Sequence, residues 1–196
     1  MVKIDKLAFY SINIDYLEFL HQKDSEVYYN SSYRNSLKPF LGIIIGIDDF
    51  NYFIPLTSAK EKHSRMKLRT REHLLVYEKE PKSRERDHWV YRECNEDSNY
   101  HIFGMLDIKK MIPVPEGLYQ KINFDDFDKY YAALLNKEFN FCLEKRRAIS
   151  KLASNLHKQQ LKKGKPLAKH CNFLLLENAM KEWKIAVGHT NSIRRK

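Results

Sequence analysis

The sequence has few cysteines, and no pattern that would join them. Cys94, Cys142 and Cys171 are odd in number and far apart, and no CxxC pair is present. This spacing implies no disulfide framework. The eight histidines form no HExxH pattern. The sequence therefore gives no indication of a zinc site, and we expect neither a metal nor another cofactor.

Long apolar runs are also missing. No window reaches the roughly 18 uncharged apolar residues that a membrane-spanning helix needs. The first residues, Met1–Lys6, lack the apolar centre and small-residue cleavage site of a signal peptide. Together these features predict a cytoplasmic protein.

Several enzymatic signatures are absent. The chain contains no GxxxxGK[ST] loop, no GxGxxG and no GxSxG elbow, which argues against nucleotide-dependent and elbow-hydrolase chemistry. Two carboxylate pairs, Asp48-Asp49 and Asp125-Asp126, fall at an expected turn and an expected helix start. These local roles explain them better than a metal-dependent nuclease site does.

Positive charge is abundant and unevenly distributed. The net charge is +10 and the pI is about 9.4. Residues 145–169 hold nine Lys or Arg and no acidic residue, and residues 57–92 hold eleven basic residues against six acidic ones. Two basic segments beside a compact core are typical of a protein that binds a polyanion. The alternative is a generally basic surface without a specific partner.

The pattern of apolar residues predicts one α+β domain of 196 residues. Residues 1–122 are expected to form mainly a small, strongly curved antiparallel sheet or barrel. Residues 123–187 keep a helical period and are expected to pack on it as helices, with residues 188–196 as a flexible tail. Strands are expected at Lys6–Ile12, Phe40–Ile47, Asn51–Leu56, Leu74–Tyr77, Tyr100–Ile108, Met111–Pro115 and Gly117–Ile122. Helices are expected at Ile14–Gln22 after an Asn13 cap, at Asp125–Arg147 continuing to Gly164, and at Asn172–Trp183. The charged stretches Glu78–Asp87 and Glu93–Asn99 are expected to be exposed excursions.

The segment after the second expected strand carries the most chemistry. From Thr57 to His63 it holds two hydroxyls, two ammonium groups (Lys60 and Lys62) and an imidazole. A loop supported by a strand is a stiff mount for such groups, and this set suits a phosphate. The alternative is a turn that caps the strand, followed by a solvated basic loop.

Residues before the hairpin complete this group. Because Phe40–Ile47 and Asn51–Leu56 are expected to pair antiparallel, Lys38 should approach Thr57 and Ser58, with Tyr33 on the same loop. Hydroxyl, ammonium and phenol groups without carboxylates fit metal-free cleavage of RNA. In that reaction the ribose 2′-hydroxyl is the nucleophile, so the protein need only orient it, move a proton and stabilise the charged phosphorane.

Further residues are candidates for RNA contact. Arg65, Lys67, Arg69 and Arg71 alternate in position, so an extended segment would present them on one side as a phosphate track. Lys62, and Arg34 beside Tyr33, are additional candidates, and residues 158–165 carry a second group of lysines. His63 has two interpretations, a proton shuttle or a residue that contacts RNA or packs locally. Trp89 and Tyr91 are candidates for stacking on unpaired bases, and the alternative for Trp89 is that it covers the sheet.

The run Phe40-Leu-Gly-Ile, followed by Tyr52–Lys60 and His63, resembles the toxins of type III toxin–antitoxin systems, the ToxN/AbiQ-like endoribonucleases. Three other segments agree in order and spacing, so the resemblance covers most of the chain. They are the Phe9-Tyr10 strand leading into Tyr16–Leu20, the segment Gly104–Pro113, and Cys171–Phe173 followed by Leu175–Glu177.

The resemblance implies a metal-independent, sequence-preferring endoribonuclease with a fold similar to the Kid/MazF toxins. Its substrate would be mRNA, cleaved to 2′,3′-cyclic phosphate and 5′-hydroxyl ends, in abortive defence against phage. A repetitive, pseudoknot-like RNA antitoxin would inhibit it in a closed protein–RNA ring. Thr57 and Ser58 would hold the scissile phosphate and the attacking ribose. Lys60 would stabilise the pentavalent charge or move a proton, facing Lys38, with Tyr33 (or Tyr28 or Tyr29) nearby.

Two alternatives stay open at this point. One is a non-catalytic RNA-binding module in which the Thr-Ser-x-Lys segment only grips phosphate. The other is a relative that acts on DNA.

Overall fold

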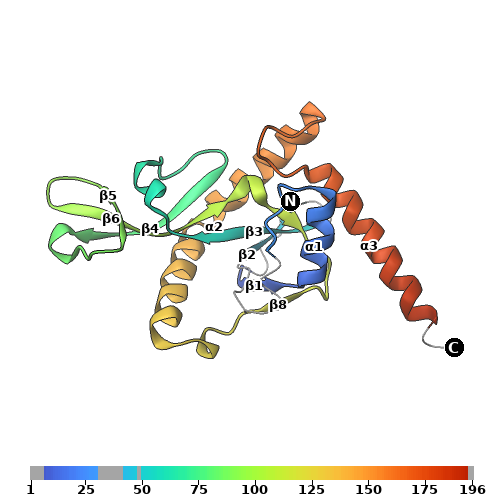
Figure 1. The fold of residues 1–196 in the computed structure, drawn as a ribbon. Helices are drawn as coiled ribbons and strands as arrows, with labels where there is room; N and C mark the ends of the chain where they lie inside the picture. Colours follow the sequence, from blue (N-terminus) through green and yellow to red (C-terminus); the bar gives the residue numbers. More distant parts are fainter. Residues whose placement is uncertain (1–6, 31–41, 48–49, 194–196) are drawn as a thin grey trace.

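The computed structural model describes residues 7–30, 42–47 and 50–193 (Figure 1). Its strands are β1 (Phe9–Ile12), β2 (Gly42–Ile47), β3 (Phe50–Ser58), β4 (His73–Pro81), β5 (Val90–Glu93), β6 (Ser98–Asp107), β7 (Ile112–Pro113) and β8 (Tyr119–Lys121). Its α-helices are α1 (Ile14–Lys23), α2 (Lys129–Lys163) and α3 (Phe173–Ile193). The expected α+β class is confirmed.

All strand pairs in the sheet are antiparallel. The order is β4-β6-β3-β2-β1-β8, with β5 paired to β6 and β7 paired to β3. The two ends of this order, β4 and β8, do not pair with each other within the described ranges. The sheet is therefore open there rather than closed into a barrel.

Strand β3 exchanges one partner for another along its length. Its first part pairs with β2 as the predicted hairpin, from Ile47 opposite Phe50 to Gly42 opposite Pro55. Its last residues, Leu56 to Ser58, pair with β6 instead. Because this second ladder extends the strand, Thr57 and Ser58 lie in β3 and not in the loop that the sequence predicted.

The two expected excursions around residue 85 and residue 96 were wrong in part. The segment Glu78–Pro81 continues β4 and pairs with the start of β6, and Val90–Glu93 forms β5 on the other side of β6. These three strands form an arm that extends away from the helices (Figure 1). Charged side chains suit an arm with much exposed surface, while its backbone groups are still satisfied by the ladder.

The helix ends follow their capping residues. The Asn13 side chain accepts a hydrogen bond from the Tyr16 amide at 3.0 Å, which confirms the predicted cap of α1. The second helix begins at Lys129 after an Asp128 cap, later than the predicted Asp125, because residues 124–126 form a 3-10 turn. It ends at Gly164, whose φ of 67° is left-handed. Helix α3 continues to Ile193, where a flexible tail was expected from residue 188.

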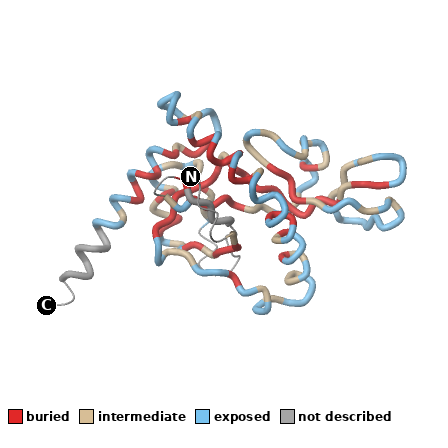
Figure 2. The backbone as a smooth tube through the Cα atoms, turned by 180° about the vertical axis from the view of Figure 1, so that it is seen from behind, coloured by how far each residue is buried: buried red, intermediate tan, exposed pale blue. Residues whose placement is uncertain are grey.

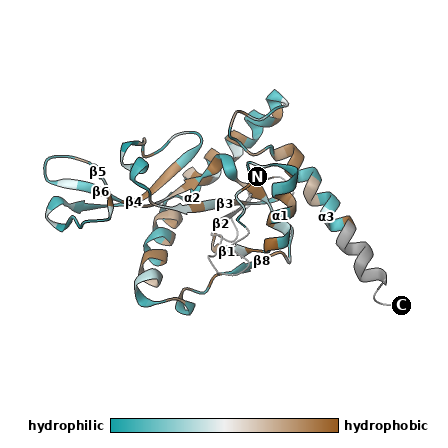
Figure 3. Ribbon diagram, viewed as in Figure 1, coloured by the Kyte–Doolittle hydropathy of each residue, from teal (hydrophilic) through white to brown (hydrophobic). Residues whose placement is uncertain are grey.

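The core lies between the sheet and the helices, and Figures 2 and 3 show buried, apolar chain concentrated there. Tyr52 on β3 is fully buried, and its hydroxyl donates to Glu177 on α3 at 2.7 Å. His157 on α2 contacts the same Glu177 oxygen at 2.7 Å. The middle of β3 is thus tied to both long helices and gives the end of the strand a rigid support. No helix in the described part of the chain is both long and apolar enough to span a membrane.

Candidate functional site

The end of β3 presents the two predicted hydroxyl groups. Ser58 is exposed and lies opposite Gly104 of β6. Thr57 is half-buried, and its Oγ1 donates to the Met105 carbonyl at 3.4 Å. After Ser58 the ladder continues for one more bond, from the Ala59 amide to the Phe103 carbonyl at 3.0 Å. Both hydroxyls are therefore held by the pairing of β3 with β6, which continues past them to Ala59.

A 3-10 turn, Glu61–Arg65, follows directly and positions the first lysines. Lys60 and Lys62 are exposed. His63 is buried, and its Nδ1 accepts a hydrogen bond from the Lys60 amide at 3.1 Å. Burial, followed by the charges of Lys62 and Lys60, lowers the pKa of His63. His63 thus packs locally as a neutral ring that fixes the start of the turn, one of the two interpretations the sequence left open.

Three predicted site residues, Tyr33, Arg34 and Lys38, lie outside the described residues. The two tyrosines named as alternatives to Tyr33 are described. The Tyr28 hydroxyl donates to Asp107 Oδ2 at 2.7 Å, and burial together with this bond raises the pKa of Tyr28. Tyr29 packs beside His21, with ring centroids 5.5 Å apart. Tyr28 is therefore a neutral phenol that anchors its segment to the end of β6.

The predicted phosphate track connects the 3-10 turn to β4. Its four basic side chains are exposed and alternate with half-buried ones; the exposed residues are Arg65, Lys67, Arg69 and Arg71. Backbone bonds fold the segment back on β4, since the Leu75 amide donates to Leu68 at 2.9 Å and the Thr70 amide to His73 at 2.9 Å. The alternation expected from sequence is present, and the backbone that carries it is fixed.

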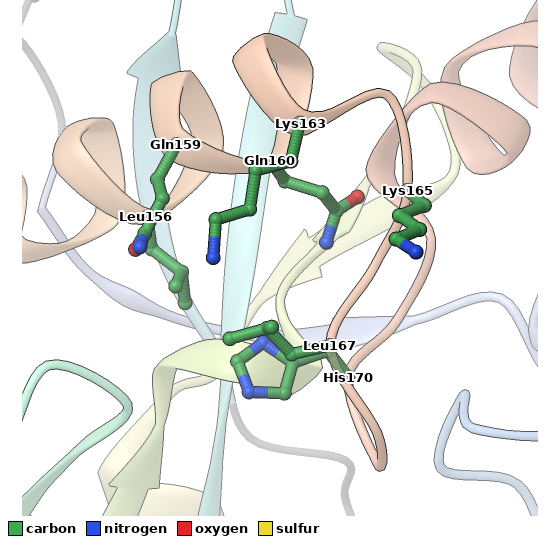
Figure 4. Close-up of a pocket in the computed structure, with 7 residues that line it drawn as sticks. All are labelled: Leu156, Gln159, Gln160, Lys163, Lys165, Leu167 and His170. Atoms are coloured by element: carbon green, nitrogen blue, oxygen red, sulfur yellow. The ribbon is translucent and has the colours of Figure 1, made fainter.

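The second lysine group adjoins this track in space. Lys163 and Lys165 line a small hollow where α2 ends, above His170 (Figure 4). His170 Nε2 lies 3.3 Å from Glu72 Oε1, directly after the track. The Glu72–His170 contact therefore brings the end of the basic track, residues 65–71, close to the lysines at the end of α2, about 90 residues later in the sequence.

Aromatic residues of the arm pack on one another. The Trp89 ring stacks on His101 at a centroid distance of 4.3 Å and an angle of 9°, and Arg86 lies 4.8 Å above the indole. His101 in turn contacts Glu80 at 2.7 Å. Trp89 covers the sheet, as one of the two interpretations held, although 43% of its surface stays exposed.

Two residues beside the site were missed by sequence reasoning. Glu138 on α2 is only 4% exposed, and burial raises its pKa to about 8. A Cβ atom added to Gly104 would lie 3.1 Å from Glu138 Oε1 and 2.6 Å from the Thr57 carbonyl oxygen. A signal was present, because Glu138 falls in the buried stripe of α2 between Leu135 and Phe141.

Two of the three cysteines, Cys142 and Cys171, are buried. Among the residues that the structure describes, no group of three or more His, Cys, Asp or Glu could hold a metal ion. Burial raises the pKa of Cys142 and of Cys171, so both thiols are neutral. The side chains exposed at and just after the end of β3 include the Ser58 hydroxyl and the Lys60 and Lys62 ammonium groups.

Comparison with known proteins matches this arrangement to one family. Residues 8–181 match the model of the family described as toxin ToxN of type III toxin–antitoxin systems. The chain is 25% identical to endoribonuclease ToxN of Bacillus thuringiensis subsp. kurstaki over 94% of this chain and 88% of that protein. It is also 25% identical to endoribonuclease ToxN of Pectobacterium atrosepticum, over 90% and 94% of the two chains. A solved structure from a study of toxin inhibition by a non-coding RNA pseudoknot has the same fold, with a TM-score of 0.66, 23% identity and coverage of 92% and 99%.

Proposed function

The chain belongs to the ToxN family of type III toxin–antitoxin toxins, and we propose that it is a metal-independent endoribonuclease toxin that acts in the cytoplasm on mRNA. The whole chain serves this function as a single domain. The observation that carries the proposal is the Thr57–Ser58 pair, held at the rigid end of β3 and followed at once by the exposed Lys60. The relatives named endoribonuclease align over almost the full chain, including this segment.

The chemistry follows from the groups that are present. An attack by the ribose 2′-hydroxyl on the adjacent phosphate needs orientation, proton transfer and stabilisation of the added negative charge. Thr57 and Ser58 hold the scissile phosphate and ribose, and the Lys60 ammonium stabilises the pentavalent phosphorane or moves a proton. Lys38 and Tyr33, which precede β2 in the sequence, are the further residues proposed for this group. The products carry a 2′,3′-cyclic phosphate and a 5′-hydroxyl.

The basic surface provides the binding energy. The track of Arg65, Lys67, Arg69 and Arg71, with the exposed Lys62, contacts the backbone of the substrate strand, and phosphate contacts of this kind set the affinity for RNA. Arg34 stays a further candidate for such a contact. The lysines at the end of α2 extend this surface past the Glu72–His170 contact. A folded RNA longer than the cleaved strand would cover both parts.

The same surface explains inhibition without a conformational switch. A repetitive, pseudoknot-like RNA antitoxin bound across it, in a closed protein–RNA ring, excludes the substrate by occupying its place. The related solved structure comes from a study of selective toxin inhibition by a non-coding RNA pseudoknot. Release from the antitoxin then gives abortive defence against phage. We further propose that the curved sheet is related to that of the Kid/MazF toxins, which superposition of the two folds tests.

Alanine substitutions separate a nuclease from a module that only binds RNA. Ser58→Ala and Lys60→Ala should lose cleavage while keeping RNA affinity within several-fold, because each side chain acts mainly on the reacting phosphate. Matched controls are Ser83→Ala on the arm and Lys121→Ala on β8, both exposed and remote from the site. Loss of affinity without any cleavage in the wild type would establish the binding module instead. A 2′-deoxy substitution at the cleaved nucleotide should abolish reaction, whereas a DNA-directed enzyme would tolerate it.

A further inference from the structure

A buried carboxyl group lies next to the candidate site, on the face of the sheet to which the Ser58 side chain points. Ser58 and Gly104 are opposite each other in an antiparallel pair, and such residues direct their side chains to one face. The position that a Gly104 Cβ would take on that face is 3.1 Å from Glu138 Oε1. Glu138 therefore occupies the space that a side chain at position 104 would otherwise fill.

The surroundings of Glu138 are almost free of charge. Towards the sheet it faces the Leu56 side chain and the Thr57 carbonyl group of β3, both close to the same Gly104 position. On its own helix the titratable neighbours are Tyr131 and Cys142, whose pKa values are raised by burial and then by Glu138. The only cause resolved for its own raised pKa of about 8 is burial. A pKa raised in this way favours the protonated form of the Glu138 carboxyl group at neutral pH.

We propose that Glu138 is a positioning residue of the cleavage site, and that its carboxyl group, packed against Gly104, supports the Ser58–Gly104 pair in the geometry that binds the scissile phosphate. This inference rests on the proposed nuclease function. The carboxyl group fills the space behind Gly104 and so sets the distance between α2 and the end of β3.

Ionisation of Glu138 would oppose phosphate binding. A carboxylate on the Ser58 face repels the incoming phosphate, and a weakly polarisable interior strengthens that repulsion. The repulsion is reciprocal, because a bound phosphate makes the carboxyl group harder to ionise. The site therefore works with Glu138 protonated and weakens as the pH rises through the range in which Glu138 loses its proton.

The test compares the wild type with Glu138→Gln, which keeps the shape and stays neutral at every pH. Single-turnover cleavage of an RNA oligonucleotide is measured from pH 6.5 to 9.5 with protein in excess over the RNA but below its dissociation constant. The rate then reports kcat/KM, which follows the pKa of Glu138 in the RNA-free protein. Taking the ratio of variant to wild type removes the pH dependence of the 2′-hydroxyl itself. The ratio should be near one at pH 6.5 and should rise to about 10-fold at pH 9, where about one wild-type molecule in eleven is still protonated.

Controls separate positioning from folding. Glu144→Gln changes an exposed residue of the same helix and should give a ratio of one throughout. All rates are compared at a temperature at which thermal melts show each protein folded. A Glu138→Gln ratio that does not change with pH would overturn the inference while leaving the nuclease function intact.

A binding measurement keeps the inference testable in the absence of cleavage. Affinity for the same oligonucleotide with a 2′-deoxy group at the cleaved position is measured at pH 6.5 and 9. The wild type should bind more weakly at pH 9 than Glu138→Gln does, and equal affinities would contradict the inference. If the wild type cleaves no RNA at any pH, the proposed function fails, and with it the role of Glu138 in cleavage; the second comparison then decides only whether Glu138 controls RNA binding at this site. Should Glu138→Gln not fold, the carboxyl group is titrated in Ser58→Ala by isotope-edited infrared spectroscopy. Its pKa should rise when the 2′-deoxy oligonucleotide binds, and an unchanged pKa would overturn the inference.

Discussion

Ser58 lies directly opposite Gly104, at the point where β3 has left β2 and pairs with β6. The exposed Ser58 hydroxyl is therefore carried by a strand that pairs with β6, and not by a free loop. Gly104 lets the two strands approach, because the Thr57 carbonyl oxygen would lie only 2.6 Å from an added Cβ. A reactive side chain held in this way needs little ordering when the substrate arrives.

Gly104→Ala should damage both stability and cleavage. The added methyl group meets the Thr57 carbonyl and Glu138, so the strands must separate, at a cost of about 1–3 kcal/mol in the free energy of unfolding. Displacement of Ser58 by a fraction of an ångström to 1 Å should lower single-turnover cleavage by about 10- to 100-fold. Urea unfolding and a cleavage assay below the melting temperature check the two effects.

The matched control for this change is Gly117→Ala. Gly117 has a φ of 87° and nothing within 4 Å of an added Cβ, so its substitution strains the backbone by about 1–2 kcal/mol without a clash. It lies between β7 and β8, away from the site, and cleavage by the folded variant should equal that of the wild type. Equal cleavage by Gly104→Ala would show that the Ser58–Gly104 spacing is unimportant.

The basic track should control how RNA affinity depends on salt. Replacing Lys67, Arg69 and Arg71 together by alanine removes up to three phosphate contacts. The slope of log affinity against log salt should then become shallower by about 2, at roughly 0.7 per contact with a single strand. A control with Lys121, Lys129 and Lys184 replaced by alanine carries the same change in net charge at other exposed positions. Equal slopes for the two triple variants would mean that only overall charge matters.

The buried contacts of Glu177 should make the fold sensitive to acid. Burial opposes its charge, but the hydrogen bonds from His157 and Tyr52 lower its pKa below the usual value. Because the pKa of Glu177 is lower in the folded protein than in the unfolded chain, its ionisation stabilises the fold at pH values above the unfolded-state pKa of about 4.5. This stabilisation is lost as the pH falls through the folded-state pKa. Glu177→Gln should cost about 3 kcal/mol at pH 7 and less at pH 3.

Urea unfolding at the two pH values measures this difference. The control is Glu182→Gln, which breaks an exposed pair with Lys23 at 2.8 Å and should change stability by at most about 1 kcal/mol at either pH. If Glu177→Gln lowers the free energy of unfolding by the same amount at pH 3 and at pH 7, Glu177 does not stabilise the fold as an ionised carboxylate.

Local signals predicted most of the fold. The apolar run before residue 47 and its partner gave the correct hairpin, and Asn13 gave the correct start of α1. The helical period after residue 123 gave α2, although the cap at Asp128 moved its start by four residues from the predicted Asp125. Patterns carried by neighbouring residues are visible in the sequence because they depend on local geometry.

Features that depend on distant partners were not predicted. Strands were predicted at Leu74–Tyr77 and Tyr100–Ile108, but the outer part of β4 and the whole of β5 were missed. These segments are charged, and their pairing with β6 is set by backbone bonds rather than by apolar alternation. The extension of β3 through Ser58 depends on β6, about 46 residues later in the chain. Glu138 appears in sequence as one more acidic residue on a helix, and only the packing of α2 on Gly104 reveals its place behind the site.

The most direct measurement of the central claim is cleavage of single-stranded RNA by purified, RNA-free protein after treatment with EDTA, with the product ends mapped. Wild type should cleave without added metal and leave 2′,3′-cyclic phosphate and 5′-hydroxyl ends, and Ser58→Ala should leave the RNA intact. RNA that is bound but not cut by the wild type, or cut only when a divalent metal is restored, would contradict the account.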